Sequence, residues 1–323
     1  MACLCSGLLF ADLSCHPIRC APAEGEIVNT ERITLSLGGN AANVAAGLNR
    51  LNVPVTLAGC VGDDALSSFI VQNVNKPGID TRFLRRVPGH GAGTVMQINV
   101  RDEDRRFICA AGANDCFVFD NEMFDYVRST PSIVPSGRKV IYLGGFFMLR
   151  ALEGGNAIEF FRLARQYDWI VILDVVLNGQ RDYWDILEPV LPYVDIILPN
   201  ENEGEKITNR RDPYDQAKEL LDAGAGSVVL TQGDGGTLCF SHKKQFRAGI
   251  YPANYVCGFG AGDAFTAGLI AAFLEGHEPY DSIRWGSAMG ASAVREVSPT
   301  KTLFNREELL AFLDDNHLVI EQI

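Results

Sequence analysis

The stretch Val256-Cys257-Gly258-Phe259-Gly260-Ala261-Gly262-Asp263-Ala264-Phe265 leads directly into an apolar, alanine-rich segment that we predict to be a helix. Its glycines allow backbone N–H groups to approach an anion closely, because no Cβ intervenes and a positive φ costs little. A helix start adds unpaired donors and a positive dipole end. We therefore expect Gly260, Ala261 and Gly262 to cradle an anion, with Asp263 beside them as a general base. Taken alone, the stretch also fits a glycine-rich turn in which Asp263 is only a helix-start residue.

Three further motifs occur along the chain. They are Gly38-Gly39-Asn40-Ala41-Ala42-Asn43 at the start of an apolar helix, Asn200-Glu201-Asn202-Glu203 after the strand-like Val194–Leu198, and Thr231-Gln232-Gly233-Asp234-Gly235-Gly236. In this order, and over nearly the whole length, the four motifs resemble those of the ribokinase-like (PfkB) carbohydrate kinases. The resemblance implies an enzyme that transfers the γ-phosphate of ATP to a primary hydroxyl of a pentose or ketohexose, with Mg²⁺.

Apolar runs of strand length alternate with segments of helical period. The runs are continuously apolar, as in parallel strands covered on both faces, so the rhythm predicts a doubly wound α/β fold. The predicted strands are Cys3–Phe10, Val55–Cys60, Val140–Gly144, Trp169–Asp174, Val194–Leu198 and Ser227–Thr231. The predicted helices are Ala41–Leu51, Leu66–Asn75, Asn156–Gln166, Tyr214–Ala223, Ala261–Glu275, Ser282–Val297 and Arg306–Asn316.

Two stretches depart from that rhythm. Thr94–Val100 and Arg105–Ala111 suggest antiparallel strands joined by a polar turn, and Ile18–Ser36 carries weaker strand signals. The resemblance implies one ribokinase-like α/β domain over residues 1–323, with a mostly parallel sheet flanked by helices and a small β lid from about 13–37 and 92–117. A lid would keep water from the transferred phosphate. An ordinary surface hairpin is the alternative, and open lid edges also predict a possible homodimer.

Composition excludes several classes of protein. A net charge of -12 argues against nucleic-acid binding, and no apolar run reaches the ~18–20 residues needed to span a bilayer. We see no targeting segment and expect a cytoplasmic protein without a membrane partner. The nine cysteines, an odd number, fit a reducing compartment, and Cys60, Cys109 and Cys239 are predicted to be small buried hydrophobes.

For the acceptor, the resemblance implies binding by Asp12, Gly38, Gly39, Asn40 and Asn43. One carboxylate with neutral amides suits a polyol, whose hydroxyls both donate and accept. Asn43 has the alternative of capping its helix. Arg105 and Arg106 of the predicted lid would suit a phosphate already on the acceptor, but solvated hairpin residues are the more frequent case.

For the nucleotide, the resemblance assigns Glu203 to the magnesium–phosphate region through water. It assigns to nucleotide binding a further set of residues: Asn200, Thr231, Gly233, Gly236, Ala288 and Ala291. Each has a structural alternative. Asn200 and Glu203 would form a helix cap, the glycines a tight turn, and the alanines a close helix–helix contact.

The chain departs from the family pattern at two places. Cys257-Gly258 stands where the family has Asp-Thr ahead of the glycines, and a neutral thiol poorly suits potassium, so we predict no monovalent-cation activation. Val176 stands where many relatives have the asparagine of an Asp-x-Asn.

Two rival functions remain open. A nucleoside kinase of the same family would use an aromatic slot from Phe107 or Phe117. A non-catalytic sugar or nucleotide sensor would have lost turnover through the two departures. A dehydrogenase is disfavoured, because no Gly-x-Gly-x-x-Gly follows the first strand.

Overall fold

The computed structural model describes residues 2–101, 106–133, 137–153, 155–296 and 300–323. Within these ranges a large sheet has the strand order β14-β13-β12-β11-β10-β9-β8-β1-β4-β5, and every pair from β11 to β5 is parallel. Its strands are β1 (Ala2–Gly7), β4 (Val55–Val61), β5 (Ile79–Arg86), β8 (Lys139–Gly144), β9 (Ile170–Leu173), β10 (Ile196–Ile197), β11 (Ser227–Thr231), β12 (Thr237–Ser241), β13 (Gln245–Ala248) and β14 (Ile320–Gln322).

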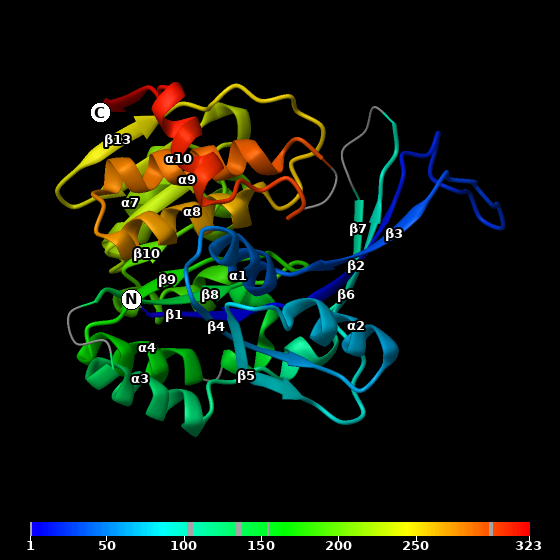
Figure 1. Cartoon of the computed structure of the whole chain (residues 1–323), viewed down its shortest axis with the longest axis horizontal. Coiled ribbons are helices and arrows are strands. Elements are labelled where there is room, and N and C mark those ends of the chain that lie inside the picture. Colours follow the sequence, from blue (N-terminus) through cyan, green and yellow to red (C-terminus); the bar gives the residue numbers. More distant parts are fainter. Residues whose placement is uncertain (1, 102–105, 134–136, 154, 297–299) are drawn as a thin grey trace.

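Helices cover both faces of this sheet (Figure 1). One apolar core cluster joins the sheet to α1 (Asn40–Arg50), α2 (Ala65–Val74), α8 (Ala261–Glu275), α9 (Pro279–Ala293) and α10 (Arg306–Asp315). The other cluster joins it to α3 (Asn121–Ile133), α4 (Asn156–Gln166), α5 (Tyr183–Leu187), α6 (Glu201–Thr208) and α7 (Pro213–Asp222). The predicted doubly wound α/β class is confirmed.

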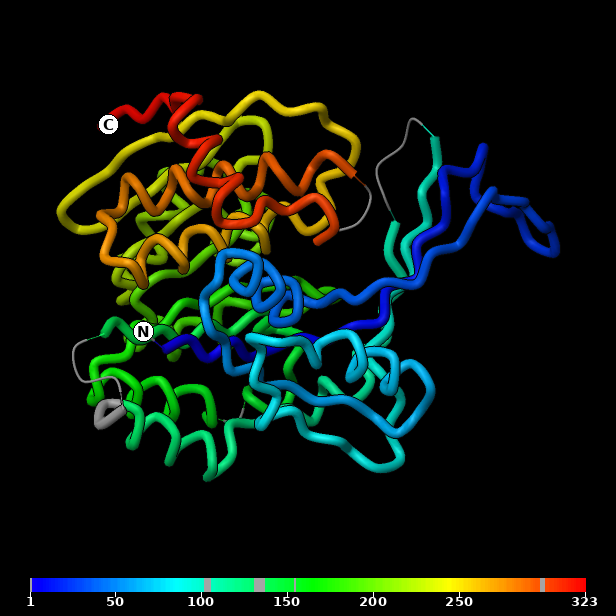
Figure 2. Tube along the Cα trace, viewed as in Figure 1, coloured from blue at the N-terminus to red at the C-terminus, as the bar shows by residue number. Residues whose placement is uncertain are grey.

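The first predicted strand, Cys3–Phe10, is wrong in one respect, because the structure divides it between two sheets. β1 ends at Gly7, whose φ of 130° and close approach to the Gly144 carbonyl allow no side chain. The chain then enters β2 (Phe10–Cys15), which leaves the body for the lid (Figure 2). Leu8 and Leu9 between them are fully buried, so the apolar run continues through the break and hides it.

The small sheet has the order β3-β2-β6-β7 and projects from the body (Figure 1). It comprises β2, β3 (Ile33–Gly38), β6 (Thr94–Ile98) and β7 (Arg106–Ala110), with β6 and β7 antiparallel as expected. Most of the predicted turn and Arg105 lie outside the described residues, as does Val297 of the helix predicted to end there. Arg106 is exposed on β7.

Two smaller predictions differ from the structure. Helix α9 begins at Pro279, three residues before the predicted start, because Glu278 is its N-cap and proline suits the first turn. Cys60 and Cys239 are buried as predicted, but Cys109 is exposed on β7. That prediction was wrong because β7 is an edge strand of the lid sheet, and all five of its residues are exposed. No helix among the described residues combines the length and apolar content needed to cross a membrane.

Candidate active site

A pocket with a cavity volume of 360 Å³ lies where β9, β10 and β11 end and α8 begins. Carboxyl ends of parallel strands are the usual ligand-facing edge of such a sheet. The polar residues that line it come from segments far apart in the chain: Asn40, Asp174, Asn200, Glu203, Thr231, Asp263 and Thr266. Phe107 of β7 closes one side and lies against Phe259, with ring centroids 6.3 Å apart.

Asp263 is held by α1 rather than by its own helix. The N-cap of α8 is Gly260, in the left-handed conformation with φ 76°. Asp263 Oδ1 accepts a hydrogen bond from Asn40 Nδ2 at 3.0 Å, and Oδ2 accepts from Asn43 Nδ2 at 2.8 Å. Burial raises the pKa of Asp263 to about 6, although both amides lower it. The carboxyl is therefore an oriented acceptor whose pKa is closer to neutrality than usual.

The glycine-rich stretch places the N-terminus of α8 at the pocket. The first four N–H groups of a helix have no intrahelical acceptor. Ala261 N–H donates to the Gly258 carbonyl at 3.3 Å, so it is partly engaged. Gly260 and Gly262 both line the pocket, and a Cβ at Gly262 would meet nothing within 4 Å. The amides of the two glycines are thus the candidate donors to an anion.

Asp174 and Tyr142 form a part of the site that the sequence reasoning did not identify. Asp174 follows β9, and its Oδ2 accepts from the Tyr142 hydroxyl at 2.9 Å and from Asn40 Nδ2 at 3.2 Å. Burial, with the charges of Glu203 and Asp263, raises the pKa of Asp174 well above its usual value. Asn40 thereby links two carboxyls. Asp174 stands at the end of a predicted strand, which was the available signal, whereas Tyr142 lies in the middle of the predicted strand Val140–Gly144 and carried none.

Asn200 and Glu203 combine a capping role with a position in the pocket. Asn200 Oδ1 accepts from Glu203 N–H and Glu203 Oε2 accepts from Asn200 N–H, both at 2.9 Å, which is a capping box at the start of α6. A bridge from Asn200 to Thr231 aligns this turn with the end of β11. Burial raises the pKa of Glu203 to about 7, with a smaller contribution from the charge of Asp263.

On the lid side, Asp12 of β2 is buried without a partner. Its side chain is 2% exposed, and neither carboxylate oxygen has a hydrogen bond within the part of the chain that the structure describes. Burial and the charge of Asp263 raise its pKa to about 7. A Cβ at Gly38 would lie 1.8 Å from Asp12 Oδ2, so only glycine fits there. Buried carboxylate oxygens without hydrogen bonds destabilise a fold unless a ligand supplies the donors.

The remaining acceptor residues adjoin Asp12 through the start of α1. Gly39, with φ 91°, is the N-cap of that helix, so the alternative capping role for Asn43 is wrong. Asn43 Oδ1 also lacks a partner among the described residues. Phe117 is fully buried in the core, which removes it as a candidate for an aromatic slot.

Four predicted nucleotide residues lie outside the lining of this pocket. Gly233 and Gly236 have φ values of 58° and 90° and form the turn between β11 and β12. Ala288 is buried in the core, and Ala291 is partly buried against it. The small residues of α9 allow close packing on α8; a Cβ at Gly286 would lie 2.9 Å from the Phe265 carbonyl.

The pocket's charges suit a divalent cation. Asp174, Glu203 and Asp263 all have raised pKa values, and no lysine or arginine is among the described residues that line the pocket. Among those residues no group of three His, Cys, Asp or Glu side chains is arranged to hold a metal directly. The arrangement therefore fits Mg²⁺ held through water and phosphate oxygens, which is how this ion usually binds.

The chain has a ribokinase-like α/β fold. An Arabidopsis thaliana ribokinase solved with ribose and ATP superposes with a TM-score of 0.83 at 24% identity, covering 97% of this chain and 99% of that one. A putative ribokinase II from E. coli, solved with ATP and Mg²⁺, superposes with a TM-score of 0.76 at 20% identity, covering 98% and 99%.

Sequence comparison identifies the family. The sequence pattern of the family described as pfkB family carbohydrate kinase matches residues 3–304, so the chain belongs to this family of sugar kinases. Among curated relatives, a 5-dehydro-2-deoxygluconokinase of Clostridium perfringens is 30% identical over 293 residues, covering 86% of this chain and 83% of the relative.

Proposed function

We propose that this protein transfers the γ-phosphate of ATP to a primary hydroxyl of a pentose, a ketohexose or a related sugar acid. The observation that carries the proposal is the position of Asp263, held by Asn40 and Asn43 beside the unpaired amides of Gly260 and Gly262. A base and an anion cradle around one point are what in-line phosphoryl transfer to an alcohol needs.

In the proposed reaction, Asp263 takes the proton of the acceptor hydroxyl as its oxygen bonds to the γ-phosphorus. The bond from that phosphorus to the bridging oxygen of ADP breaks, and ADP leaves. The amides of Gly260 and Gly262 hold the charge on the phosphoryl oxygens. Mg²⁺, when bound, neutralises charge on the β- and γ-phosphates. Glu203 and Asn200 would orient its water ligands.

Asp12 supports a polyol acceptor at the lid side. Two buried carboxylate oxygens without partners match a pair of sugar hydroxyls that donate to them. The relative named 5-dehydro-2-deoxygluconokinase supports including sugar acids among the acceptors. Phe107 and Phe259 at the pocket edge support a nucleoside as the second candidate, because a base can stack on aromatic rings.

The test is ADP release with Mg²⁺-ATP and a panel of acceptors: ribose, fructose, 5-dehydro-2-deoxygluconate and adenosine. Acceptor-dependent ADP formation with a sugar or sugar acid is expected. A response to adenosine alone would favour the nucleoside kinase. Thermal stabilisation by a sugar without any ADP would indicate a sensor and overturn the proposal.

We also propose that the outer face of the lid pairs with a second copy of the chain. Leu35, Leu13, Met96 and Ile108 are neighbours across β3, β2, β6 and β7, so they share one face. Met96 and Ile108 are 46% and 60% exposed. A dimer in sedimentation that Ile108→Lys converts to monomer would agree, whereas a monomeric parent protein would refute it.

A further inference from the structure

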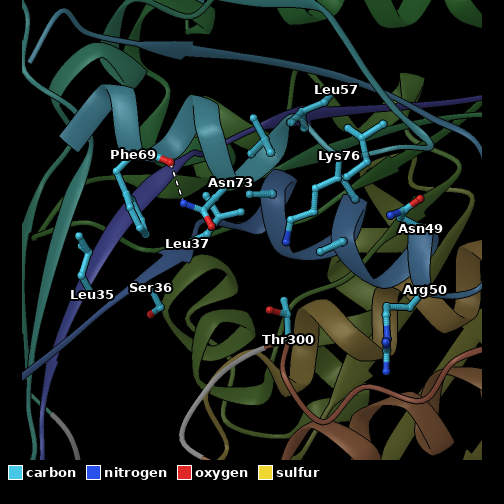
Figure 3. A pocket seen from close by; sticks show the side chains of 15 residues that line it. Leu35, Ser36, Leu37, Asn49, Arg50, Leu57, Phe69, Asn73, Lys76 and Thr300 are labelled. Carbon is cyan, nitrogen blue, oxygen red and sulfur yellow. Dashed lines mark hydrogen bonds between the residues drawn. The ribbon is translucent and has the colours of Figure 1, made fainter. Parts of the chain in front are cut away.

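A second pocket, of 300 Å³, lies at the root of the lid and shares no lining residue with the candidate active site. Strand β3 forms one wall, α1 and α2 form two others, and Thr300 closes the fourth side (Figure 3). Its volume is at the lower end of the range of about 300–1,000 Å³ that small-molecule sites occupy.

The charged side chains that line this pocket are Arg50 and Lys76, and no aspartate or glutamate is among the described residues that line it. Arg50 Nη2 donates to the Leu303 carbonyl at 2.8 Å, and no carboxylate pairs with it in the described part of the chain. The Lys76 ammonium extends into the middle of the pocket, between Asn73 and Thr300 in the view of Figure 3. A pocket lined by two cations and no carboxylate stands out on a protein of net charge -12.

The negative carboxyl ends of two helices neutralise only part of this positive charge. α1 ends at Arg50 and α2 ends at Val74, so both carboxyl ends adjoin the pocket. A helix carboxyl end is equivalent to about half a negative charge, so two ends offset about one of the two cations. A positive charge of about one remains, which suits a monoanion.

The rest of the lining is apolar or carries hydroxyl and amide groups. Ala42, Ala45 and Leu57 form a buried apolar floor. Thr300 lines the pocket with a hydroxyl that makes no hydrogen bond to a described residue, and Ser36 contributes to the wall formed by β3. This combination favours a ligand with one anionic head and an apolar body over a free inorganic ion.

We propose that this pocket binds a small organic carboxylate, with its head group at Lys76 and Thr300 and its apolar body over Ala42 and Ala45. The ligand would touch β3 of the lid and α1 of the body together. Since α1 also carries Asn40 and Asn43, on either side of Ala42, binding would couple the lid root to the helix that holds Asp263. The binding site does not depend on the proposed function of the active site.

The experiment uses the full chain with ADP and Mg²⁺ saturating the candidate active site, and 3-phenylpropanoate as the probe. Methyl NMR of labelled alanine, leucine and valine should show saturable shifts at Leu37, Ala42 and Ala45. The neutral 3-phenylpropanamide and inorganic phosphate should each bind at least about tenfold more weakly, as should the probe to Lys76→Met. Lys218→Met, on the exposed face of α7, is the matched control and should bind normally.

Each opposite result would overturn the proposal. If the amide binds as tightly as 3-phenylpropanoate, the pocket does not recognise the negative charge. If phosphate binds as tightly as 3-phenylpropanoate, the apolar body of the ligand contributes nothing to binding. Unchanged affinity in Lys76→Met, no methyl shifts with any probe, or shifts confined to Val175 and Leu198 would show that this pocket is not the site.

Discussion

Replacing Asp263 by asparagine should change activity and stability in opposite directions. The substitution keeps the size of the side chain but removes the base that we propose for the acceptor proton. Positioned bases contribute about 10²–10⁴ in rate, so turnover should fall by that factor. ATP affinity should change little, because the amides of Gly260 and Gly262 remain.

The stability change follows from the raised pKa of Asp263. A rise from 3.8 to about 6 means that the fold disfavours the ionised carboxylate by about 3 kcal/mol. That cost is absent below about pH 3.8, grows as the pH rises from 3.8 to 6, and is complete above pH 6. Asparagine removes the cost. Asn40 and Asn43 donate to different oxygens of Asp263, however, and the NH2 group that replaces one oxygen cannot accept, so the lost hydrogen bond offsets about 1–2 kcal/mol of the gain. We expect a net stabilisation of about 1–2 kcal/mol at pH 8.

The assay pairs ADP release, with the acceptor found in the panel, with urea unfolding at pH 8 and at pH 4. The stabilisation should be present at pH 8 and lost at pH 4. Turnover within about threefold of the parent protein would remove Asp263 from the base role. A variant destabilised at pH 8 would show that the carboxylate is favourably, not unfavourably, buried.

Three further predictions concern the chemistry of the candidate active site. Because the base must be ionised and the pKa of Asp263 is about 6, kcat/KM should be level above about pH 7 and fall about tenfold per pH unit below 6; a level profile down to pH 5 would contradict this. Glu203→Gln keeps an oxygen for the Asn200 N–H but loses the charge, so about tenfold more Mg²⁺ should be needed for half-maximal ADP release, with the melting temperature little changed; an unaltered Mg²⁺ titration would remove Glu203 from the metal region. Exchange of sodium for potassium should leave the rate almost unchanged, because Cys257 occupies the position of a family carboxylate; a large saturable stimulation in a potassium titration would show another cation site.

Much of the fold could be predicted because its signals are local. Continuously apolar strands between helical segments specify a parallel sheet covered on both faces, and the structure has that sheet. The lid was harder to delimit. Its first strand continues an apolar run from the large sheet, and no local pattern marks that the chain changes sheet at Gly7.

The capping box could be predicted from the sequence, but the fact that its two residues also line the pocket could not. Asn200 and Glu203 have the spacing of a capping box, and the structure contains that box. The same two side chains line the pocket because β10 and β11 are neighbours, which brings Thr231 beside Asn200. Sheet order of this kind depends on which strands pair, and the local pattern does not state it.

The sequence by itself determined which chemical groups are available: the glycine-rich start of α8, its aspartate, and the amides of the Gly38–Asn43 segment. Only the tertiary structure determined which of these groups contact one another and how deeply they are buried. Asn40 and Asn43 reach Asp263 across 223 and 220 residues of chain, and Tyr142 meets Asp174 from a neighbouring strand. Burial by the surrounding elements then raises the pKa values of Asp12, Glu203 and Asp263. The physical reason is that desolvation and long-range hydrogen bonds depend on what surrounds a side chain in space, whereas motifs and periodicity record only its neighbours along the chain.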